Sequence, residues 1–317
     1  MNPNFAIQLT DIQAAAERLK SRVVRTPTIF SESLTAEFGC NIHLKLENLQ
    51  HAGAFKTRGA TNAILLLKEA QKKAGVVTHS SGNHGAALAR AAQAEGIHAT
   101  IVMPHNTLPF KIANVERFGA KIVFSDPDER SRQATANQIQ LETGAHFIHP
   151  FNDPHVMAGQ GTVALEILEQ ATYLDSVVIP VGGGGLLSGC LTAFKTLRPD
   201  IKVYAAEPKL ADDAYRSVRS GKIEQPTRYD TIADGLRTPL GSNTFPIIKR
   251  LIEDIILVDE DNISTAQQDL LQHSKQLVEP SGSVGLSAVR SSLSRFKGAH
   301  VAVVLTGGNV SPQNLKK

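Results

Sequence analysis

The sequence predicts an α/β protein with two open, mostly parallel twisted sheets and helices on their faces. Short runs rich in β-branched residues alternate with longer amphipathic stretches along almost the whole chain. This alternation is that of consecutive strand–helix units, which build parallel sheets. Several predicted strands are also continuously apolar, as expected for strands that helices cover on both faces.

The predicted elements fall into two series, which meet near residue 150. We expect helices at residues 11–22 (with Thr10 as N-cap), 57–72, 83–94, 110–118, 130–142, 157–171, 186–197, 264–276 and 283–292. We expect strands at residues 42–46, 76–79, 98–104, 121–125, 146–149, 176–181, 202–206, 255–258 and 300–305. The compact block at residues 76–149 suggests a small, mobile domain inserted into a large domain made of residues 1–68 and 150–317.

The composition argues against several classes of protein. Of the 317 residues, 42% are hydrophobic and 20% are charged, which is ordinary for a globular protein. The net charge of +3 is spread without a basic block, so we expect no binding to nucleic acid or to an anionic membrane. No secretion signal and no apolar run of the ~20 residues needed to cross a bilayer is present. Cys40 and Cys190 lie far apart and form no motif, so we expect packing residues in a reducing, cytoplasmic environment.

Lys56 lies between Phe55 and Arg58 at the expected start of a helix. Most lysines are solvated surface residues. A lysine beside an aromatic ring, near a cation and at a helix start can instead have a lowered pKa. The free amine that results can form a Schiff base with a carbonyl group.

A second segment, Ser80-Ser81-Gly82-Asn83-His84-Gly85, directly follows a predicted strand and precedes a helix. Backbone NH groups at a helix start, together with two hydroxyls and an amide, form a suitable cradle for a carboxylate. Ser and Asn are also ordinary helix caps, so the segment alone is equally consistent with a capping loop.

A third segment, Gly182–Gly185, lies between a buried strand and a helix. Glycines let backbone NH groups approach an anion, and the helix dipole favours a phosphate there. The run lacks the Gly-Lys-Ser/Thr ending of a nucleotide P-loop, and Ser188 breaks the GxGxxG pattern. Glu207 ends the next strand at the position of a ribose-binding acid, which leaves an NAD site as an alternative.

A fourth segment, Thr306-Gly307-Gly308-Asn309, follows the last predicted strand. The carboxyl end of a parallel strand is where α/β proteins bind ligands, and a hydroxyl there can hydrogen-bond to an unprotonated ring nitrogen. The loops follow strands, so all of these segments can converge on one crevice.

In this order, the four segments resemble the motifs of the fold type II pyridoxal-phosphate family, in its serine racemase and serine/threonine dehydratase branch. A-F-K-T-R-G-A is similar to the family's S-F-K-x-R-G-A, and T-G-G-N to its closing S/T-G-G-N. S-S-G-N-H-G and G-G-G-G match outright. The resemblance covers essentially the full length. It implies a tryptophan synthase β-like fold, pyridoxal 5'-phosphate as cofactor, a small amino acid as substrate and a homodimer.

The resemblance also implies roles for the matched residues. Lys56 would form the Schiff base and remove the Cα proton, and Ser81 would act as acid or base on the opposite cofactor face. Asn83 would meet the 3'-oxygen of the cofactor, and Thr306 would face its pyridine nitrogen. The cofactor-binding set is Phe55, Lys56, Asn83, Gly182, Gly183, Gly184, Gly185 and Thr306, with the glycines on the phosphate. The substrate carboxylate would be held by Ser80, Ser81, Asn83 and His84.

The stretch A-E-P-K-L-A-D-D is similar to the divalent-metal segment of the same branch. It implies Glu207, the Ala211 carbonyl and Asp213 as ligands of Mg²⁺, or of Ca²⁺ or Mn²⁺, with waters completing the oxygen shell. The alternatives are a solvated acidic helix start and the NAD site, which needs Glu207 for the ribose.

Two departures from the family pattern bear on the reaction. Ala54 replaces the usual serine before Phe-Lys, and Phe151 in H-P-F-N-D-P resembles the dehydratases rather than the animal racemases, which have Asn there. Both favour elimination over efficient racemisation. The short stretch after Asn309 also leads us to expect no isoleucine-regulated domain.

The sequence therefore predicts a serine/threonine ammonia-lyase, with serine racemase as the alternative of the same chemistry. A nicotinamide-dependent oxidoreductase and a non-catalytic amino-acid sensor are the alternatives from other classes.

Overall fold

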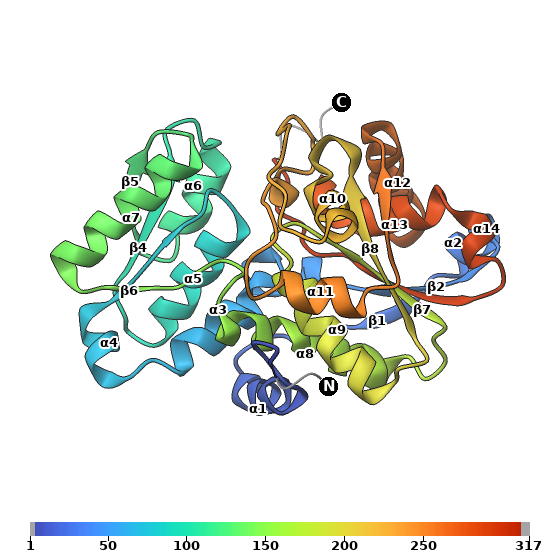
Figure 1. Cartoon of the computed structure of the whole chain (residues 1–317), viewed down its shortest axis with the longest axis horizontal. Coiled ribbons are helices and arrows are strands. Elements are labelled where there is room, and N and C mark those ends of the chain that lie inside the picture. The colour runs from blue at the N-terminus through green and yellow to red at the C-terminus, as the bar shows by residue number, and fades with distance from the viewer. Residues whose placement is uncertain (1–3, 312–317) are drawn as a thin grey trace.

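The computed structural model describes residues 4–311, which form two lobes, each around its own sheet (Figure 1). The large sheet contains, from edge to edge, β1 (Thr28–Phe30), β2 (Asn41–Lys45), β10 (His300–Val304), β7 (Ser176–Pro180), β8 (Lys202–Pro208) and β9 (Asp254–Val258). The small sheet contains β5 (Lys121–Ser125), β4 (Ala99–Pro104), β3 (Val76–His79) and β6 (His146–Phe147). All pairs are parallel except β1 with β2. The predicted α/β class with two mostly parallel sheets is confirmed.

Helices cover both sheets (Figure 1). Those outside the small lobe are α1 (Leu9–Leu19), α2 (Glu32–Phe38), α3 (Lys56–Leu65), α8 (Pro154–Gln170), α9 (Gly185–Leu197), α10 (Asp213–Ser220), α11 (Phe245–Leu251), α12 (Glu260–Ser274), α13 (Pro280–Arg290) and α14 (Leu293–Phe296). Those of the small lobe are α4 (Glu69–Ala74), α5 (Asn83–Ala94), α6 (Pro109–Glu116) and α7 (Glu129–Thr143). The small sheet lies wholly inside the predicted block 76–149, and the mobility of that block stays a prediction.

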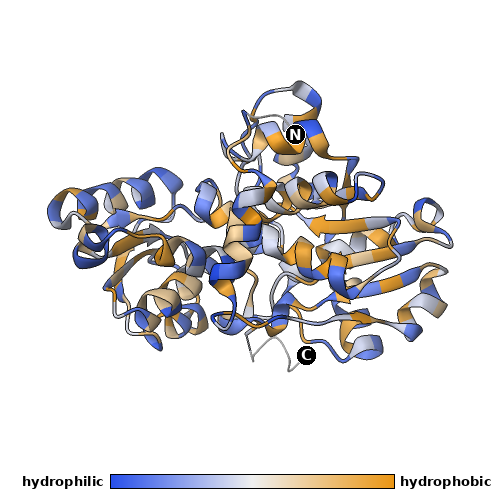
Figure 2. Cartoon of the chain, turned by 90° about the horizontal axis from the view of Figure 1, so that it is seen from below, coloured by the Kyte–Doolittle hydropathy of each residue, from blue (hydrophilic) through white to orange (hydrophobic). Residues whose placement is uncertain are grey.

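Apolar side chains from the strands and the inner helix faces form the cores. Two large clusters cover the faces of the six-stranded sheet, and two smaller ones belong to the small lobe. Figure 2 shows the strands as mainly hydrophobic and the outer helix faces as hydrophilic. This pattern explains why the strand predictions agree closely with the structure. None of the helices in residues 4–311 has the length and apolar character needed to cross a membrane.

The helix predicted at residues 57–72 is wrong as a single element. The structure has α3, then a short break, then α4. At the break the backbone NH groups of Leu66 and Leu67 donate to carbonyls three residues earlier. The turn places the Leu67 side chain, which is 8% exposed, in the core of the small lobe. Burial of Leu67 thus accompanies the loss of helical continuity.

Smaller differences concern helix starts and short elements. Helix α1 begins at Leu9 with Gln8 as N-cap, not Thr10, because Gln8 and Asp11 form a reciprocal capping box. Helices α12 and α13 begin earlier than predicted. The sequence prediction also missed β1, α2, α10, α11 and α14.

Candidate active site

Lys56 is the first residue of α3, and its side chain is half-buried between the lobes. Its Nζ donates a hydrogen bond to the Pro150 carbonyl at 2.7 Å and lies 5.2 Å from the centre of the Phe55 ring. Burial lowers the pKa of Lys56 to about 8. Loss of solvent lowers this pKa, and the charge of Arg58 does not contribute. The expectation that a nearby cation lowers the pKa of Lys56 is therefore wrong. A larger fraction of this amine than of an ordinary surface lysine is therefore uncharged near neutral pH.

The segment before Lys56 is tied to the end of β10. The Phe55 NH donates to the Thr306 carbonyl at 3.1 Å, and the Gly308 NH donates to the Gly53 carbonyl at 2.9 Å. Ala54 and Gly307 form an antiparallel bridge. The first and last predicted site segments therefore lie side by side, although about 250 residues separate them in the sequence.

The Ser80–Gly85 segment is the turn from β3 into α5, and it faces the same region. Asn83 accepts a hydrogen bond from Asn309 at 2.8 Å, and the buried His84 contacts the Ile148 carbonyl at 3.3 Å. Burial, with a further contribution from Lys56, holds the pKa of His84 well below its usual value, so its imidazole is neutral. Ser80, Ser81 and Asn83 are half-buried at this turn. Backbone NH groups at the start of α5 are available to an anion.

The Gly182–Gly185 segment joins β7 to α9. Gly184 is the N-cap with φ +85°, a conformation that favours glycine. A Cβ on Gly183 would lie 2.3 Å from the Phe151 ring, so the backbone approaches that ring more closely than any side chain would allow. Phe151 follows Pro150, the acceptor for Lys56, which brings the glycine segment to the same crevice. All four predicted segments are therefore brought together.

Comparison with known proteins identifies the family. The model of the family described as "Pyridoxal-phosphate dependent enzyme" matches residues 19–307. The chain belongs to this family. It is 44% identical to serine racemase of Arabidopsis thaliana over 96% of this chain and 94% of that protein. It is 43% identical to β-hydroxyaspartate dehydratase of Paracoccus denitrificans (strain Pd 1222), over 96% and 97%. The structure of threonine deaminase isoform 2 from Solanum lycopersicum superposes with a TM-score of 0.90 at 33% identity, over 97% and 90%.

The crevice fits the cofactor of this family. Lys56 provides an amine with a lowered pKa, and Gly182–Gly185 provide a helix start where only backbone fits. Among the described residues, the buried Thr306 hydroxyl makes one long hydrogen bond, 3.5 Å, to the Ser281 carbonyl. Within residues 4–311, the buried His84 Nδ1 has no hydrogen-bond partner. These groups could hold a pyridoxal phosphate and the amino acid joined to it. The roles of the individual residues toward the cofactor and the substrate stay predictions.

Glu279 is a residue of this crevice that the sequence argument missed. Its carboxylate accepts a hydrogen bond from Asn83 Nδ2 at 2.6 Å, and its backbone NH donates to the Gly307 carbonyl. Burial, reinforced by Asp234, raises its pKa to about 7. A Cβ on Gly307 would lie 2.3 Å from Glu279 Oε1. Glu279 therefore links two predicted site segments through a buried carboxyl group.

Glu207 and Asp213 form a buried acidic pair. Glu207 lies in β8 and accepts hydrogen bonds from the NH groups of Ala214 and Tyr215 at 2.7 and 2.8 Å. Both carboxylate oxygens of Asp213 are buried and lack a partner within the described residues. Burial, and for Glu207 also Asp213, raises both pKa values, to about 7 for Asp213. Unpaired buried oxygens of this kind fit a divalent cation. Both Glu207 oxygens already accept backbone NH groups.

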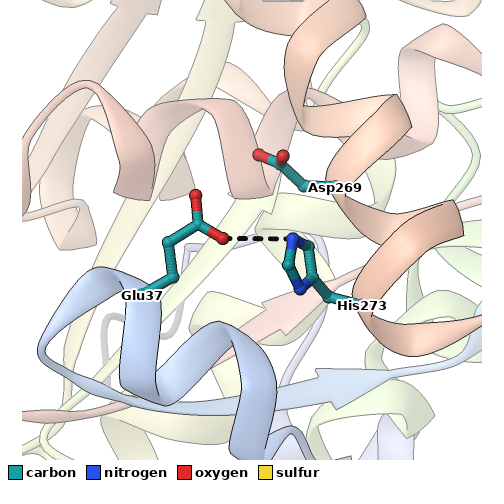
Figure 3. Close-up of side chains that lie close together, drawn as sticks. All are labelled: Glu37, Asp269 and His273. Atoms are coloured by element: carbon teal, nitrogen blue, oxygen red, sulfur yellow. Dashed lines mark ion pairs between the residues drawn. The ribbon is translucent and has the colours of Figure 1, made fainter.

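A second group of possible ligands, Glu37, Asp269 and His273, lies between α2 and α12 (Figure 3). Arg290 forms ion pairs with both carboxylates, at 3.1 Å to Glu37 and 2.7 Å to Asp269, and His273 contacts Glu37 at 3.2 Å. The chain itself therefore supplies the positive charge here. This group is a salt-bridge cluster that joins three helices.

Proposed function

We propose that this enzyme dehydrates and deaminates L-serine, L-threonine or related 3-hydroxy-amino acids, giving a 2-oxo acid and ammonia. The observation that carries the proposal is the position of Lys56, whose buried amine faces the linker His149–Asn152 and the glycine segment. The dehydratase and deaminase names of two relatives support it. Phe151 supports elimination because it resembles the residue of the dehydratases. Its ring packs on Gly183, next to Pro150, the acceptor of Lys56.

Bound pyridoxal phosphate would supply an electron sink that acidifies the Cα–H bond of the amino acid. Lys56 Nζ would then take the Cα proton, which an amine with a pKa near 8 can accept at neutral pH. Ser80, Ser81, Asn83 and His84 would hold the substrate carboxylate and orient the Cα–H bond toward Lys56. His84 would contribute its backbone NH, because its only ring NH already points at the Ile148 carbonyl. Loss of the proton and the β-hydroxyl removes one water. Hydrolysis then takes up one water and releases ammonia and the 2-oxo acid.

Serine racemisation is the second candidate, and the name of the Arabidopsis relative favours it. It needs a second proton carrier on the opposite face of the substrate, and Ser81 is the residue proposed for it. The two reactions share Lys56 and differ in whether Ser81 returns a proton before the hydroxyl leaves. One crevice could therefore catalyse both.

We also propose a divalent cation at Glu207, Asp213 and the Ala211 carbonyl, with Mg²⁺ as the first choice and Ca²⁺ or Mn²⁺ as alternatives. The unpaired oxygens of Asp213 support it. A homodimer and a cytoplasmic location are proposed by analogy with the family.

The deciding experiment incubates the purified holoprotein with L-serine, D-serine, L-threonine and threo-3-hydroxyaspartate. Formation of 2-oxo acid and the chirality of the remaining amino acid are measured together. We expect oxo acid from at least one substrate, no reaction in Lys56→Ala, and borohydride labelling of Lys56. In Ser81→Ala, elimination should persist while any racemisation is lost. Full activity in Lys56→Ala would disprove the proposal, and chirality change without oxo acid would favour the racemase.

A further inference from the structure

Arg58 is almost completely buried two residues after Lys56, and its guanidinium is held by two carboxylates at once. Its Nε and Nη2 donate to the two oxygens of Glu47, each at 2.8 Å. Its Nη1 and Nη2 donate to the two oxygens of Glu166 at 2.6 and 2.8 Å. The side chains of Arg58, Glu47 and Glu166 are 1%, 0% and 14% exposed. Two bidentate contacts fix both the position and the orientation of the planar guanidinium.

The two carboxylates come from different elements of the large lobe. Glu47 lies two residues after the end of β2, in a short 3-10 turn (Glu47–Leu49), and Glu166 lies on α8. Lys45, on β2, also donates to Glu166 at 2.6 Å, and its side chain is fully buried. The four charges sum to zero within the network. Arg58 therefore attaches the first turn of α3 to the large sheet and to α8 with no net buried charge.

The helical geometry connects this attachment to Lys56. Successive residues are ~100° apart around a helix, so Lys56 and Arg58 point roughly 200° apart, on nearly opposite sides of α3. Arg58 faces the large lobe, and Lys56 faces the crevice and Pro150. A rotation of α3 about its axis would break the contacts of Arg58 and turn the Lys56 amine away from the crevice.

We propose that Arg58 is a positioning residue for Lys56: its paired contacts to Glu47 and Glu166 fix the rotation of α3 and so the direction of the Lys56 side chain. The inference rests on the proposed role of Lys56. A buried ion network is weak evidence for stability, because desolvation offsets most of its attraction, but it specifies one geometry. Lys56 needs one fixed direction, because its amine has to reach the Cα–H bond of the substrate.

The first test uses the protein without cofactor, so it does not depend on turnover. Lys56 is acetylated with acetic anhydride over a range of pH, and its pKa is read from the labelled peptide by mass spectrometry. In wild type we expect about 8. In Arg58→Lys, which keeps the charge and loses both bidentate contacts, we expect a pKa higher by roughly one unit, a tenfold smaller fraction of free amine at neutral pH.

Two controls separate positioning from general loss of stability. Arg290→Lys makes the same chemical change in the Glu37–Asp269 cluster. Arg290 is the last residue of α13, and Glu279 caps the other end of that helix. Lys45→Met disturbs the buried network without touching α3. Both should leave the Lys56 pKa unchanged, whatever they do to the melting temperature. If Arg58→Lys does not fold, Glu166→Gln replaces it and should shift the Lys56 pKa in the same direction by a smaller amount.

The second test uses the holoenzyme. We expect Arg58→Lys to lower kcat by about 100-fold, the cost of a ~1 Å misplacement of a catalytic group, with KM within about twofold. An unchanged Lys56 pKa together with an unchanged kcat in the folded variant would overturn the inference. A wild-type holoprotein without borohydride label on Lys56 would instead disprove the proposed function, so the two failures can be distinguished.

Discussion

Two pairs of buried acidic residues in this protein have opposite surroundings. Glu47 and Glu166 share Arg58, and Lys45 also contacts Glu166. Within the described residues, the Asp213 oxygens have no partner, and Glu207 receives only backbone NH groups. Burial disfavours the charged form of a carboxyl group and raises its pKa unless a positive charge opposes it.

The pKa values follow this difference. Burial disfavours the charge of Glu47, but Arg58 and Lys45 outweigh burial and hold its pKa below the usual value. At Glu207 and Asp213, burial is not opposed by a neighbouring cation of comparable effect, and the pKa values are raised. The chain itself provides a cation for Glu47 and Glu166 but not for Glu207 and Asp213. Where it does not, an external cation is the simplest source of the missing charge.

The largest expected effect comes from removing the internal cation. Arg58→Ala leaves Glu47 and Glu166 buried without their main partner, so we expect the free energy of unfolding to fall by ~3–5 kcal/mol. Urea denaturation of the cofactor-free protein measures this. A loss below ~1 kcal/mol would mean that the network is not desolvated in solution, and the comparison would fail.

The next effect comes from supplying the external cation. Mg²⁺ at ~100 times its dissociation constant should raise the free energy of unfolding by ~2.7 kcal/mol. Asp213→Asn should remove most of this gain. Glu37→Gln is the matched control, because Arg290 already pairs with that carboxylate, and it should keep the gain. A gain of equal size in Asp213→Asn, measured by thermal melting with and without chelator, would place the cation elsewhere.

A smaller effect concerns pH. Asp213 has a pKa of 3.8 when unperturbed and about 7 in the fold, so between these values the native protein holds a proton that the unfolded chain has released. Its contribution to stability is complete below pH 4 and is lost as the pH rises through 7. We expect the free energy of unfolding of wild type, relative to Asp213→Asn, to fall over this range without metal. Saturating Mg²⁺ should remove the slope, and a rise with pH would contradict the assignment.

The smallest effect is expected at an exposed ion pair. Arg228 and Asp230 contact each other, but the side chains of both are more than half exposed. Solvent already stabilises both charges, so we expect Arg228→Ala to leave the urea midpoint unchanged within error. A clear destabilisation would show that an exposed ion pair also contributes to stability, so that burial would not explain the large effects expected at the two acidic pairs.

Much of the site could be predicted because its signals are local. Lys56, Gly182–Gly185 and Ser80–Gly85 each mark the end of a strand or the start of a helix with residues that lie together in the sequence. Parallel topology then brings such ends to one edge of each sheet. The local pattern was therefore sufficient to find the crevice.

The features that were missed depend on contacts between distant residues. Glu279 meets Asn83 across 196 residues, and no local pattern indicates this contact. The paired contacts of Arg58 join residues 11 and 108 positions away, so the sequence presented it only as a cation near Lys56. The break after α3 is accompanied by burial of Leu67 in the other lobe, a tertiary contact that overrides helical periodicity.

The connection of the lobes has a consequence for stereochemistry. The first turn of α3 belongs mechanically to the large lobe, whereas the turn that carries Ser81 belongs to the small lobe, which the chain joins through the break after Leu65 and the stretch before Pro154. The two proposed proton carriers, one for each face of the substrate, therefore come from elements of different lobes, and the relative motion of the lobes stays a prediction. Separation of the lobes would withdraw one carrier and keep the other. If the small lobe moves as predicted and both proposed reactions occur, their ratio would depend on how long the lobes stay together, and no residue that touches the substrate would need to change.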